Sequence, residues 1–298
     1  MTKPIPLGKF TPGSTEWVEA RRNRLGGSEI AAVLGLSPWE SRFSLWHRKA
    51  GLAAPDADNT YTDWGRRLEP VVAAKFCEDH PEYMPLAAEQ GYAYQHPERE
   101  WQSASPDVLF LNSFCEVKTA RRADAWYDGI PVYYRTQILW TMDVLGVDHC
   151  WLAALIAGSD YREYRVELDD DAQADLTIMR QAGEEFMASL ADGTPPDIDD
   201  SYATWQTMRR LHPDIDLDVE HEVSREVAEA YYFANQDMHE AERNQRRART
   251  DVARHLGRAQ YATCEGVRIA RRQPARDGGP PVLVSTRKQP PALQEPAA

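Results

Sequence analysis

Cysteine, long apolar runs and positive charge are all scarce in this sequence. Only four cysteines occur among its 298 residues, and no two of them form a CxxC pair. We therefore expect neither a disulfide framework nor a zinc finger, but reduced and mostly buried thiols. No stretch approaches the roughly 20 apolar residues that span a bilayer, and the first residues lack the apolar core of a signal peptide. A cytoplasmic protein without membrane association is the expectation.

The shortage of positive charge is uneven along the chain. Overall, 34 Lys and Arg stand against 47 Asp and Glu, a net charge of −13. Residues 1–160 hold 16 basic and 21 acidic residues (−5), residues 161–222 hold 5 and 17 (−12), and residues 223–298 hold 13 and 9 (+4). This balance excludes a protein that coats nucleic acid by bulk electrostatics. A local basic groove is still compatible with this uneven distribution of charge.

Two glycines follow an arginine-rich segment near the start of the chain. Trp17 lies in a short predicted helix that ends near Arg21, Arg22 and Arg24, and Gly26–Gly27 break it. Ser28 is then predicted as the N-cap of a second helix, from Glu29 to Leu34. A helix start with a hydroxyl and nearby arginines suits an anionic oxygen group. An ordinary capped helix beside solvated charges is the alternative.

The next elements alternate between helices and strands. An amphipathic helix is predicted over 62–80, with Glu69 at the edge of its apolar side. Three strands follow at 91–95, 101–111 and 114–119 as a meander, then a helix over 131–146 and two strands at 149–157 and 162–168. This order predicts an α/β fold, because a helix crosses before a buried strand. A further acidic helix is predicted over 170–191.

The strands at 101–111 and 114–119 carry two carboxylates and a lysine. Asp107 precedes an apolar run, and Asn112–Ser113 supply a turn that brings it back beside Glu116. Period-two alternation places Glu116 and Lys118 on one face of a strand and Val117 on the other. Two converging carboxylates suit a hard cation such as Mg²⁺, and the lysine stands next to an attacking water or a scissile phosphate. The hairpin therefore predicts a metal site.

Five separated segments together resemble a known family. They are WVEARRNRLGGS (17–28), GRRLEP around Glu69, SPD ending at Asp107, EVK from Glu116, and PVYYRTQILWTM around Gln137. In order and approximate spacing they resemble the YqaJ viral recombinase family, to which phage lambda exonuclease belongs, within the PD-(D/E)XK nuclease superfamily. The resemblance covers roughly residues 14–160. It implies a restriction-endonuclease-like core, with a central mixed sheet flanked by helices and a helical C-terminal extension.

The resemblance also implies roles for individual residues. The metal ligands would be Asp107, Glu116 and the Val117 carbonyl, with Glu69 near a second metal position. Lys118 would orient or activate the attacking water, and Gln137 would be the active-site glutamine. Arg21 and Ser28 would hold a 5′-phosphate, and Arg22 and Arg24 would be further DNA contacts.

These roles imply a Mg²⁺-dependent 5′ to 3′ exonuclease, with Mn²⁺ as a substitute metal. It would act on double-stranded DNA ends and leave 3′ single strands for phage-type homologous recombination. The implied partners are a single-strand annealing recombinase and further copies of the chain, as a trimer. The alternatives are an endonuclease of the same superfamily and a DNA-end-binding or assembly module without catalysis.

The resemblance does not extend to the C-terminal part of the chain. We divide the sequence into an exonuclease domain at 1–200, a helical and hairpin extension at 201–272 and a disordered, Pro-rich tail at 273–298. Small or apolar residues recur at three-four spacing from Val223 to Val252, which predicts either a helical hairpin or an intersubunit helix over 222–257. Residues 262–273 are predicted to form a short β-hairpin.

Overall fold

The computed structural model describes residues 3–11, 13–53, 60–86, 91–275 and 278–286. The chain divides into two compact units, Met1–Ile215 and Asp216–Ala298. The first unit extends past residue 200 because helix α7 (Tyr202–Leu211) packs on α3 (Arg42–Lys49). There the Thr204 hydroxyl is buried and lies 2.7 Å from the Ser41 hydroxyl.

The first helices differ from the prediction at their starts. Strand β1 (Ile5–Lys9) precedes α1 (Thr15–Arg22), and the short β2 (Leu25–Gly26) leads into α2 (Gly27–Val33). Gly26, not Ser28, is the N-cap of α2, and the Glu29 carboxylate accepts the Gly26 N–H at 2.8 Å. The prediction that Ser28 caps this helix was therefore wrong. The helix begins two residues earlier, and the side chain of Glu29, its third residue, accepts the N–H of the Gly26 cap. Ser28 lies within the first turn and is exposed.

The predicted three-strand meander is divided between two sheets. Strands β3 (Tyr92–Gln95) and β4 (Gln102–Ala104) belong to a sheet of order β1-β3-β4-β2. Strands β5 (Val108–Leu109) and β6 (Phe114–Ala120) belong to a second sheet of order β5-β6-β7-β8. The chain changes sheet at Ser105–Asp107, where Pro106 has no N–H to donate to a ladder. The single strand predicted over 101–111 is therefore interrupted.

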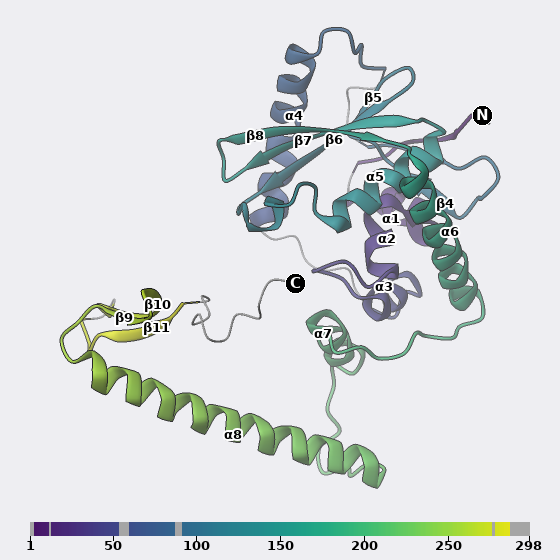
Figure 1. Ribbon diagram of the computed structural model, residues 1–298. Helices are drawn as coiled ribbons and strands as arrows, with labels where there is room; N and C mark the ends of the chain where they lie inside the picture. The colour runs from purple at the N-terminus through teal and green to yellow at the C-terminus, as the bar shows by residue number, and fades with distance from the viewer. Residues whose placement is uncertain (1–2, 12, 54–59, 87–90, 276–277, 287–298) are drawn as a thin grey trace. The chain divides into compact units, whose positions relative to one another are not determined.

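The second sheet is mixed and has helices on both faces (Figure 1). Strands β6 and β7 (His149–Ile156) are parallel, while β5–β6 and β7 with β8 (Asp160–Glu167) are antiparallel. Helix α5 (Val132–Leu145) makes the crossover from β6 to β7, after a short 3-10 helix at Asp124–Trp126. Gly146 ends α5 in the left-handed conformation, as its position predicted. The α/β class and the flanked mixed sheet are thus confirmed.

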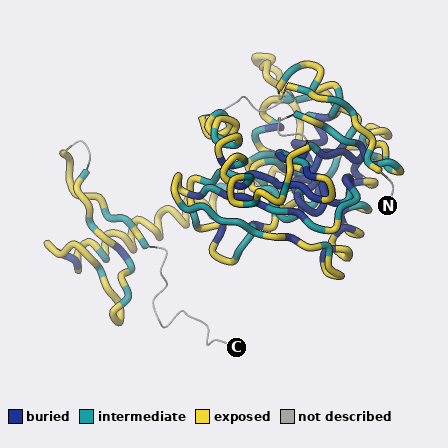
Figure 2. Tube along the Cα trace, turned by 90° about the horizontal axis from the view of Figure 1, so that it is seen from above, coloured by how far each residue is buried: buried dark blue, intermediate teal, exposed yellow. Residues whose placement is uncertain are grey.

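Two apolar clusters hold these layers together. On one face, α5 packs on the sheet, and α2 and α6 (Asp170–Ala191) pack on α5, through residues such as Ile138, Ile30 and Leu176. On the other face, α4 (Thr60–Asp79) buries Val72 and Phe76 against Val117. Buried segments fill the interior of this unit in Figure 2. The sheet and the helices that cross it are therefore rigidly positioned.

The second unit contains one long helix and a three-stranded sheet. Helix α8 spans Arg225–Leu256 as one continuous helix, so of the two predicted alternatives the helical hairpin was wrong. The predicted β-hairpin is confirmed as β9 (Tyr261–Cys264) and β10 (Val267–Gln273). Strand β11 (Val282–Ser285) pairs with β10, so these four residues differ from the predicted disordered tail. Residues 276–277 and 287–298 of that tail lie outside the described residues.

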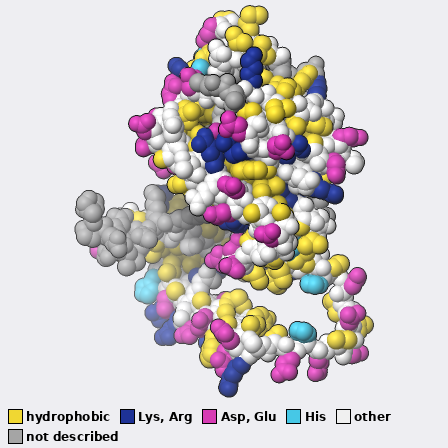
Figure 3. Space-filling model, turned by 90° about the vertical axis from the view of Figure 1, so that its right-hand side faces the viewer, with side chains coloured by type: hydrophobic (Ala, Val, Ile, Leu, Met, Phe, Trp, Pro, Cys, Tyr) yellow, Lys and Arg dark blue, Asp and Glu magenta, His cyan; other side chains and the backbone are white. Residues whose placement is uncertain are grey.

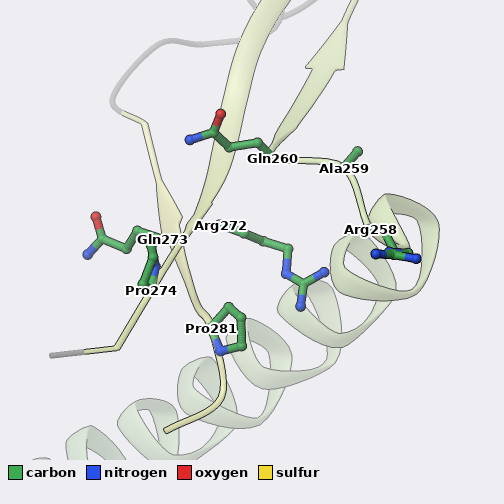
Figure 4. A pocket seen from close by; sticks show the side chains of 7 residues that line it. All are labelled: Arg258, Ala259, Gln260, Arg272, Gln273, Pro274 and Pro281. Carbon is green, nitrogen blue, oxygen red and sulfur yellow. The ribbon is translucent and has the colours of Figure 1, made fainter. Parts of the chain in front are cut away.

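An open pocket of about 380 Å³ lies between the end of α8 and this sheet (Figure 4). Arg258, Gln260, Arg272 and Pro281 are among the residues that line it. The Arg272 guanidinium donates a hydrogen bond to the Gly257 carbonyl, and this bond joins β10 to the end of α8. The pocket is therefore explained by the junction between the sheet and the end of α8.

Across the described ranges, no helix is long and apolar enough to cross a membrane. The four cysteines are free thiols, with Cys115 and Cys150 buried, Cys77 half-buried and Cys264 exposed.

Candidate functional site

The β5–β6 hairpin brings Asp107 back beside Glu116, as the sequence predicted. Val108 pairs with Cys115 in antiparallel register, so the residue before Val108 lies opposite the residue after Cys115. The turn is closed by the Phe110 N–H, which donates to the Ser113 carbonyl at 2.9 Å. The Val117 N–H donates to Asp107 Oδ2 at 2.7 Å. In a strand the N–H and C=O of one residue point to the same side, so the Val117 carbonyl faces this edge too.

Glu116 is the centre of the polar contacts on β6. Its side chain is buried, and Lys118 Nζ donates to Glu116 Oε1 at 2.7 Å. Gln137 Nε2, from the crossing helix α5, donates to the same oxygen. Within the described residues, Glu116 Oε2 is buried without a hydrogen-bond partner. One carboxylate oxygen is thus held by two donors while the other is left for a further ligand.

Glu69 joins this group from helix α4. It is half-buried, and its side chain hydrogen-bonds with that of Asp107. The structure therefore brings together all five predicted catalytic side chains, which come from one hairpin and two helices: Glu69, Asp107, Glu116, Lys118 and Gln137.

The electrostatics of the site are those of crowded carboxylates. Burial raises the pKa of Asp107 to about 7, and the charge of Glu69 adds to this effect. Burial and the charge of Asp107 likewise raise the pKa of Glu116 to about 7. For Lys118, burial opposes the charged form, but the nearby Glu116 and Asp107 outweigh it and raise the pKa above its ordinary value. Carboxylates that repel one another in this way favour a bound cation.

The donor set fits a hard divalent cation. Oxygen ligands are available from Asp107, from the unpartnered Oε2 of Glu116 and from the Val117 carbonyl. Among the described residues, no group of three or more His, Cys, Asp or Glu side chains has the arrangement of a complete metal site. The oxygen donors of Asp107, Glu116 and Val117 are of the kind that Mg²⁺ prefers, an ion that keeps several waters and takes only one or two protein carboxylates.

Arg21 and Ser28 are brought together at the start of α2. Arg21 Nη2 donates to Ser28 Oγ at 3.2 Å, and its guanidinium lies 4.6 Å from the centre of the Trp17 ring. A Cβ at Gly26 would lie only 2.6 Å from Arg21 Nη2, so the glycine makes room for the guanidinium. The Arg21 side chain keeps 20% of its surface exposed. The Arg21 guanidinium and the Ser28 hydroxyl therefore lie together at the start of α2, where solvent reaches them.

This point adjoins the carboxylates through helix α5. A Cβ at Gly27 would lie 3.2 Å from the Gln137 carbonyl oxygen and 3.0 Å from Thr141 Oγ1. The second glycine of the predicted pair therefore permits a close crossing of α2 and α5. Because Gln137 also contacts Glu116, the two parts of the candidate site meet on this helix.

Arg22 and Arg24 have different surroundings. The Arg22 side chain is 55% exposed and lies 3.8 Å from Glu19. Arg24 donates to the Gln95 side chain and to the Ala20 carbonyl, so its guanidinium links α1 to β3. The proposed role of these two residues in contacting DNA stays a prediction.

A buried glutamate that the sequence reasoning overlooked supports Arg21. Glu29 is only 3% exposed. Its carboxylate lies 2.9 Å from Lys49 Nζ, 3.0 Å from Arg48 and 3.5 Å from Arg21. Burial opposes its charge, yet these cations and the Gly26 N–H hold the pKa of Glu29 below its ordinary value. Gly26 and Glu29 have the spacing of a capping box, and this spacing could have predicted that the Glu29 side chain turns back to the start of the helix.

Comparison with known proteins agrees with this arrangement. Residues 16–148 match the model of the YqaJ-like viral recombinase domain. The uncharacterized protein YqaJ of Bacillus subtilis (strain 168) is 24% identical over 261 residues, which cover 83% of this chain and 79% of that protein. Protein D345L of African swine fever virus (strain Badajoz 1971 Vero-adapted) is 36% identical over 58 residues, 20% of this chain and 17% of that protein.

A solved structure shows the same fold. The crystal structure of LHK-Exo, an alkaline exonuclease from Laribacter hongkongensis, in complex with dAMP aligns with a TM-score of 0.50 at 21% identity. The alignment covers 60% of this chain and 94% of that protein. Residues 16–148 of this chain are therefore similar to the YqaJ-like viral recombinase domain, and the fold and the site geometry agree with that similarity.

Proposed function

We propose that the first unit is a metal-dependent deoxyribonuclease that degrades double-stranded DNA from its 5′ ends. The observation that carries this proposal is the convergence of Asp107, Glu116 and Lys118, with one buried oxygen of Glu116 left unpartnered. A buried carboxylate oxygen without a donor is costly unless a ligand satisfies it. A cation that binds a phosphodiester would do so, which accounts for both the site and its substrate class.

Asp107, Glu116 and the Val117 carbonyl would hold Mg²⁺, or Mn²⁺ in its place, with Glu69 near a second metal position. When bound, the metal supplies a water of lowered pKa and positive charge for the phosphoryl oxygens. Lys118 lies 2.7 Å from Glu116 and would hold the attacking water and balance the charge that grows on the phosphate. Gln137 would keep Glu116 in place through its donated hydrogen bond.

The contact of Arg21 with Ser28 supports action at DNA ends. A terminal 5′-phosphate carries more negative charge than an internal phosphodiester, and a guanidinium with a hydroxyl suits it. Because this pair adjoins the carboxylates through α5, a held 5′-phosphate would place the first phosphodiester near Glu116. Digestion would then proceed from 5′ to 3′ and leave a 3′ single strand. In phage-type recombination a single-strand annealing protein would bind that product.

The main alternative is an endonuclease of the same superfamily, which would use the same carboxylates without an end-binding site. A DNA-end-binding module without catalysis is a second alternative. The contact between Lys118 and Glu116 disfavours it, since end binding alone does not need a buried lysine–carboxylate pair.

A nuclease assay distinguishes these three activities. The purified chain would be incubated with linear and with covalently closed circular duplex, with Mg²⁺ or with chelator. We expect Mg²⁺-dependent loss of linear DNA and survival of the circle. Cutting of circles would support the endonuclease, and intact linear DNA at every Mg²⁺ concentration would contradict nuclease activity altogether.

Variants of the site provide the controls. Glu116→Gln removes a metal-binding charge at nearly constant shape, and Lys118→Ala removes the adjacent cation, so each should abolish digestion while circular dichroism remains that of the folded chain. Glu69→Gln should raise the Mg²⁺ concentration required. An active Glu116→Gln protein would remove the basis of the assignment.

A further inference from the structure

Helix α8 is long, and almost none of it is covered. Its 32 residues correspond to a rod of about 48 Å. Among the described residues of this helix, Leu256 alone is buried. The other residues of the helix are exposed, apart from Asn235 and Val252, which are half-buried. Most helices in proteins are stabilised by packing of one face, so a helix of this length is expected to have a partner.

One face of α8 is apolar for most of its length. Val227, Tyr231 and Met238 are 57%, 75% and 51% exposed. With three exposed alanines they lie three, four or seven residues apart, which places all six on one side of the helix. The alanines are Ala234, Ala241 and Ala248. Alternation of large and small side chains allows two helices to approach closely, with a large residue of one over a small residue of the other.

The β-sheet of this unit covers only the C-terminal end of that face. Leu256 is buried there, Val252 is half-buried, and Arg249 donates to the Leu283 carbonyl at 2.7 Å. Towards the N-terminus, Val227, Tyr231 and Met238 stay exposed. The apolar stripe from Val227 to Ala248 is therefore an open surface of the second unit.

Charge along the helix is divided into two halves. Between 226 and 242 all five charged residues, histidine aside, are acidic: Glu226, Glu229, Asp237, Glu240 and Glu242. Between 243 and 256 there are five arginines, at 243, 246, 247, 249 and 254, and one acid, Asp251. The helix begins at Arg225, which pairs with Glu229, so its two halves carry charges of −4 and +4, from 1 − 5 and 5 − 1. The helix is therefore complementary in charge to a reversed copy of itself.

We propose that the α8 helices of two copies of this chain pair in antiparallel orientation. The apolar stripes would meet across a twofold axis, and the acidic half of each helix would lie beside the basic half of the other. A parallel pair would instead place five acids beside five acids, which opposes association. This pairing is separate from the nuclease proposal and from any contact made by the first unit. If the first units form the trimer that the family resemblance implies, pairing through α8 would join two such trimers.

A charge-swap experiment tests the orientation. In one variant Glu229, Glu240 and Glu242 become arginine (E229R/E240R/E242R), so the helix is mainly basic. In the other, Arg243, Arg246 and Arg247 become glutamate (R243E/R246E/R247E), so the helix is mainly acidic. The mass of the full chain would be measured by sedimentation for the wild type, for each variant and for their equimolar mixture.

We expect the wild type to contain an even number of copies, each variant alone to have half that mass, and the mixture to regain the wild-type mass. An odd number of copies in the wild type, or unchanged mass in both variants, would overturn the pairing. A mixture that stays at the lower mass would overturn its antiparallel orientation. If the acidic variant lost DNA binding without a change of mass, the arginines would serve nucleic acid instead, and the proposal would fail.

A matched pair of single variants guards against unfolding of the helix. Met238→Glu places a charge on the apolar stripe, and Gln236→Glu places the same charge on the opposite side. We expect the mass to halve for Met238→Glu alone, with equal helix content in both by circular dichroism. Equal effects of the two changes would contradict pairing through the stripe. Neither residue belongs to the nuclease site, so digestion of DNA provides a check that the first unit is intact.

Discussion

Two buried glutamates show how one residue type serves opposite purposes in this molecule. Glu29 is surrounded by cations, and their charges hold its pKa low despite burial. Glu116 lies near another carboxylate, which together with burial raises its pKa. The charge of Glu29 is balanced by Arg21, Arg48 and Lys49, so this carboxylate holds the Arg21 guanidinium in place. Around Glu116 the single lysine, Lys118, is outnumbered by carboxylates, which is why the proposed cation site lies there.

At this scale Arg21 has a specific predicted effect. Replacing it with alanine removes the guanidinium held by Trp17, Ser28 and Glu29. A charge-assisted hydrogen bond contributes about 1.5–3 kcal/mol, so we expect a preference for 5′-phosphorylated over 5′-hydroxyl duplex of about ten- to a hundred-fold to disappear. Initial rates of digestion of the two substrates measure this preference.

Arg22→Ala is the matched control, because that side chain is exposed and lies near Glu19 rather than Ser28. It should leave the preference intact. Ser28→Ala should reduce the preference with little loss of stability, since Gly26 and not Ser28 caps the helix. Equal digestion of both ends by the wild type would contradict the phosphate site.

At the scale of helices and strands, close packing determines where glycine is required. A Cβ at Gly183 in α6 would lie 2.9 Å from both Trp101 and Trp140, whose rings are embedded in the core. A Cβ at Gly65 in α4 would meet only Thr119 Oγ1, at an ordinary 3.6 Å. Alanine is favoured over glycine in helices by about 1 kcal/mol. The same substitution should therefore have opposite effects at the two positions.

We predict that Gly183→Ala lowers the free energy of unfolding by about 1–3 kcal/mol, the usual cost of overpacking. Gly65→Ala should raise it by about 0.5–1 kcal/mol. Urea titrations of both variants beside the wild type measure the difference. A stable Gly183→Ala protein would show that α6 does not lie as close to the two tryptophans as described.

His80 connects the end of α4 to strand β8 and predicts a pH effect. Its Nε2 lies 2.8 Å from Glu163, and this hydrogen bond raises the pKa of His80 above its ordinary 6.5. A raised pKa means that protonation favours the folded state, so the contribution is complete below pH 6.5 and is lost as the pH rises through the higher folded value. For a pair near the surface we expect about 1 kcal/mol or less.

Chemical unfolding of the wild type and of His80→Gln across this range gives the measurement. The difference in unfolding free energy between them should shrink as the pH rises above 6.5. A difference that is constant with pH would show that the His80–Glu163 contact is not charge-assisted. Comparison with the variant is needed because Asp107 and Glu116 titrate in the same range.

At the scale of the whole molecule, charge limits how the protein can bind DNA. The chain has a net charge of −13. On the face drawn in Figure 3, acidic and basic side chains are interspersed and form no broad patch of one sign. With this net charge, the proposed binding of DNA is expected to depend on a few well-placed phosphate contacts, and such contacts determine the salt dependence.

We predict a shallow salt dependence of duplex binding by the Lys118→Ala variant, which we expect to be inactive. Each phosphate contact contributes a slope of about −0.9 to a plot of log affinity against log salt concentration. With about five contacts or fewer, the slope should be no steeper than about −4.5. Fluorescence anisotropy with a labelled duplex measures it. A slope near −9 would require about ten contacts and would contradict a small local groove.

Much of this molecule follows from the sequence by itself, because local patterns determine local structure. The helix over 170–191 was predicted with the bounds that α6 has, and Gly146 ends α5 as expected. The Asp107–Glu116 hairpin follows from alternation and a short turn. The family resemblance supplied Glu69 and Gln137 as partners for it, residues whose roles periodicity alone does not reveal.

Only the tertiary structure decided the contacts between residues far apart in sequence. It separated β4 from β5 into different sheets, and it made Gly26 rather than Ser28 the N-cap of α2. The Glu29 carboxylate accepts the Gly26 N–H, and its buried charge is tolerated because Arg48 and Lys49 from another helix neutralise it. It also left one oxygen of Glu116 without a donor. Such outcomes depend on which groups meet after packing, and the energy of a buried charge depends on those neighbours rather than on the sequence around it.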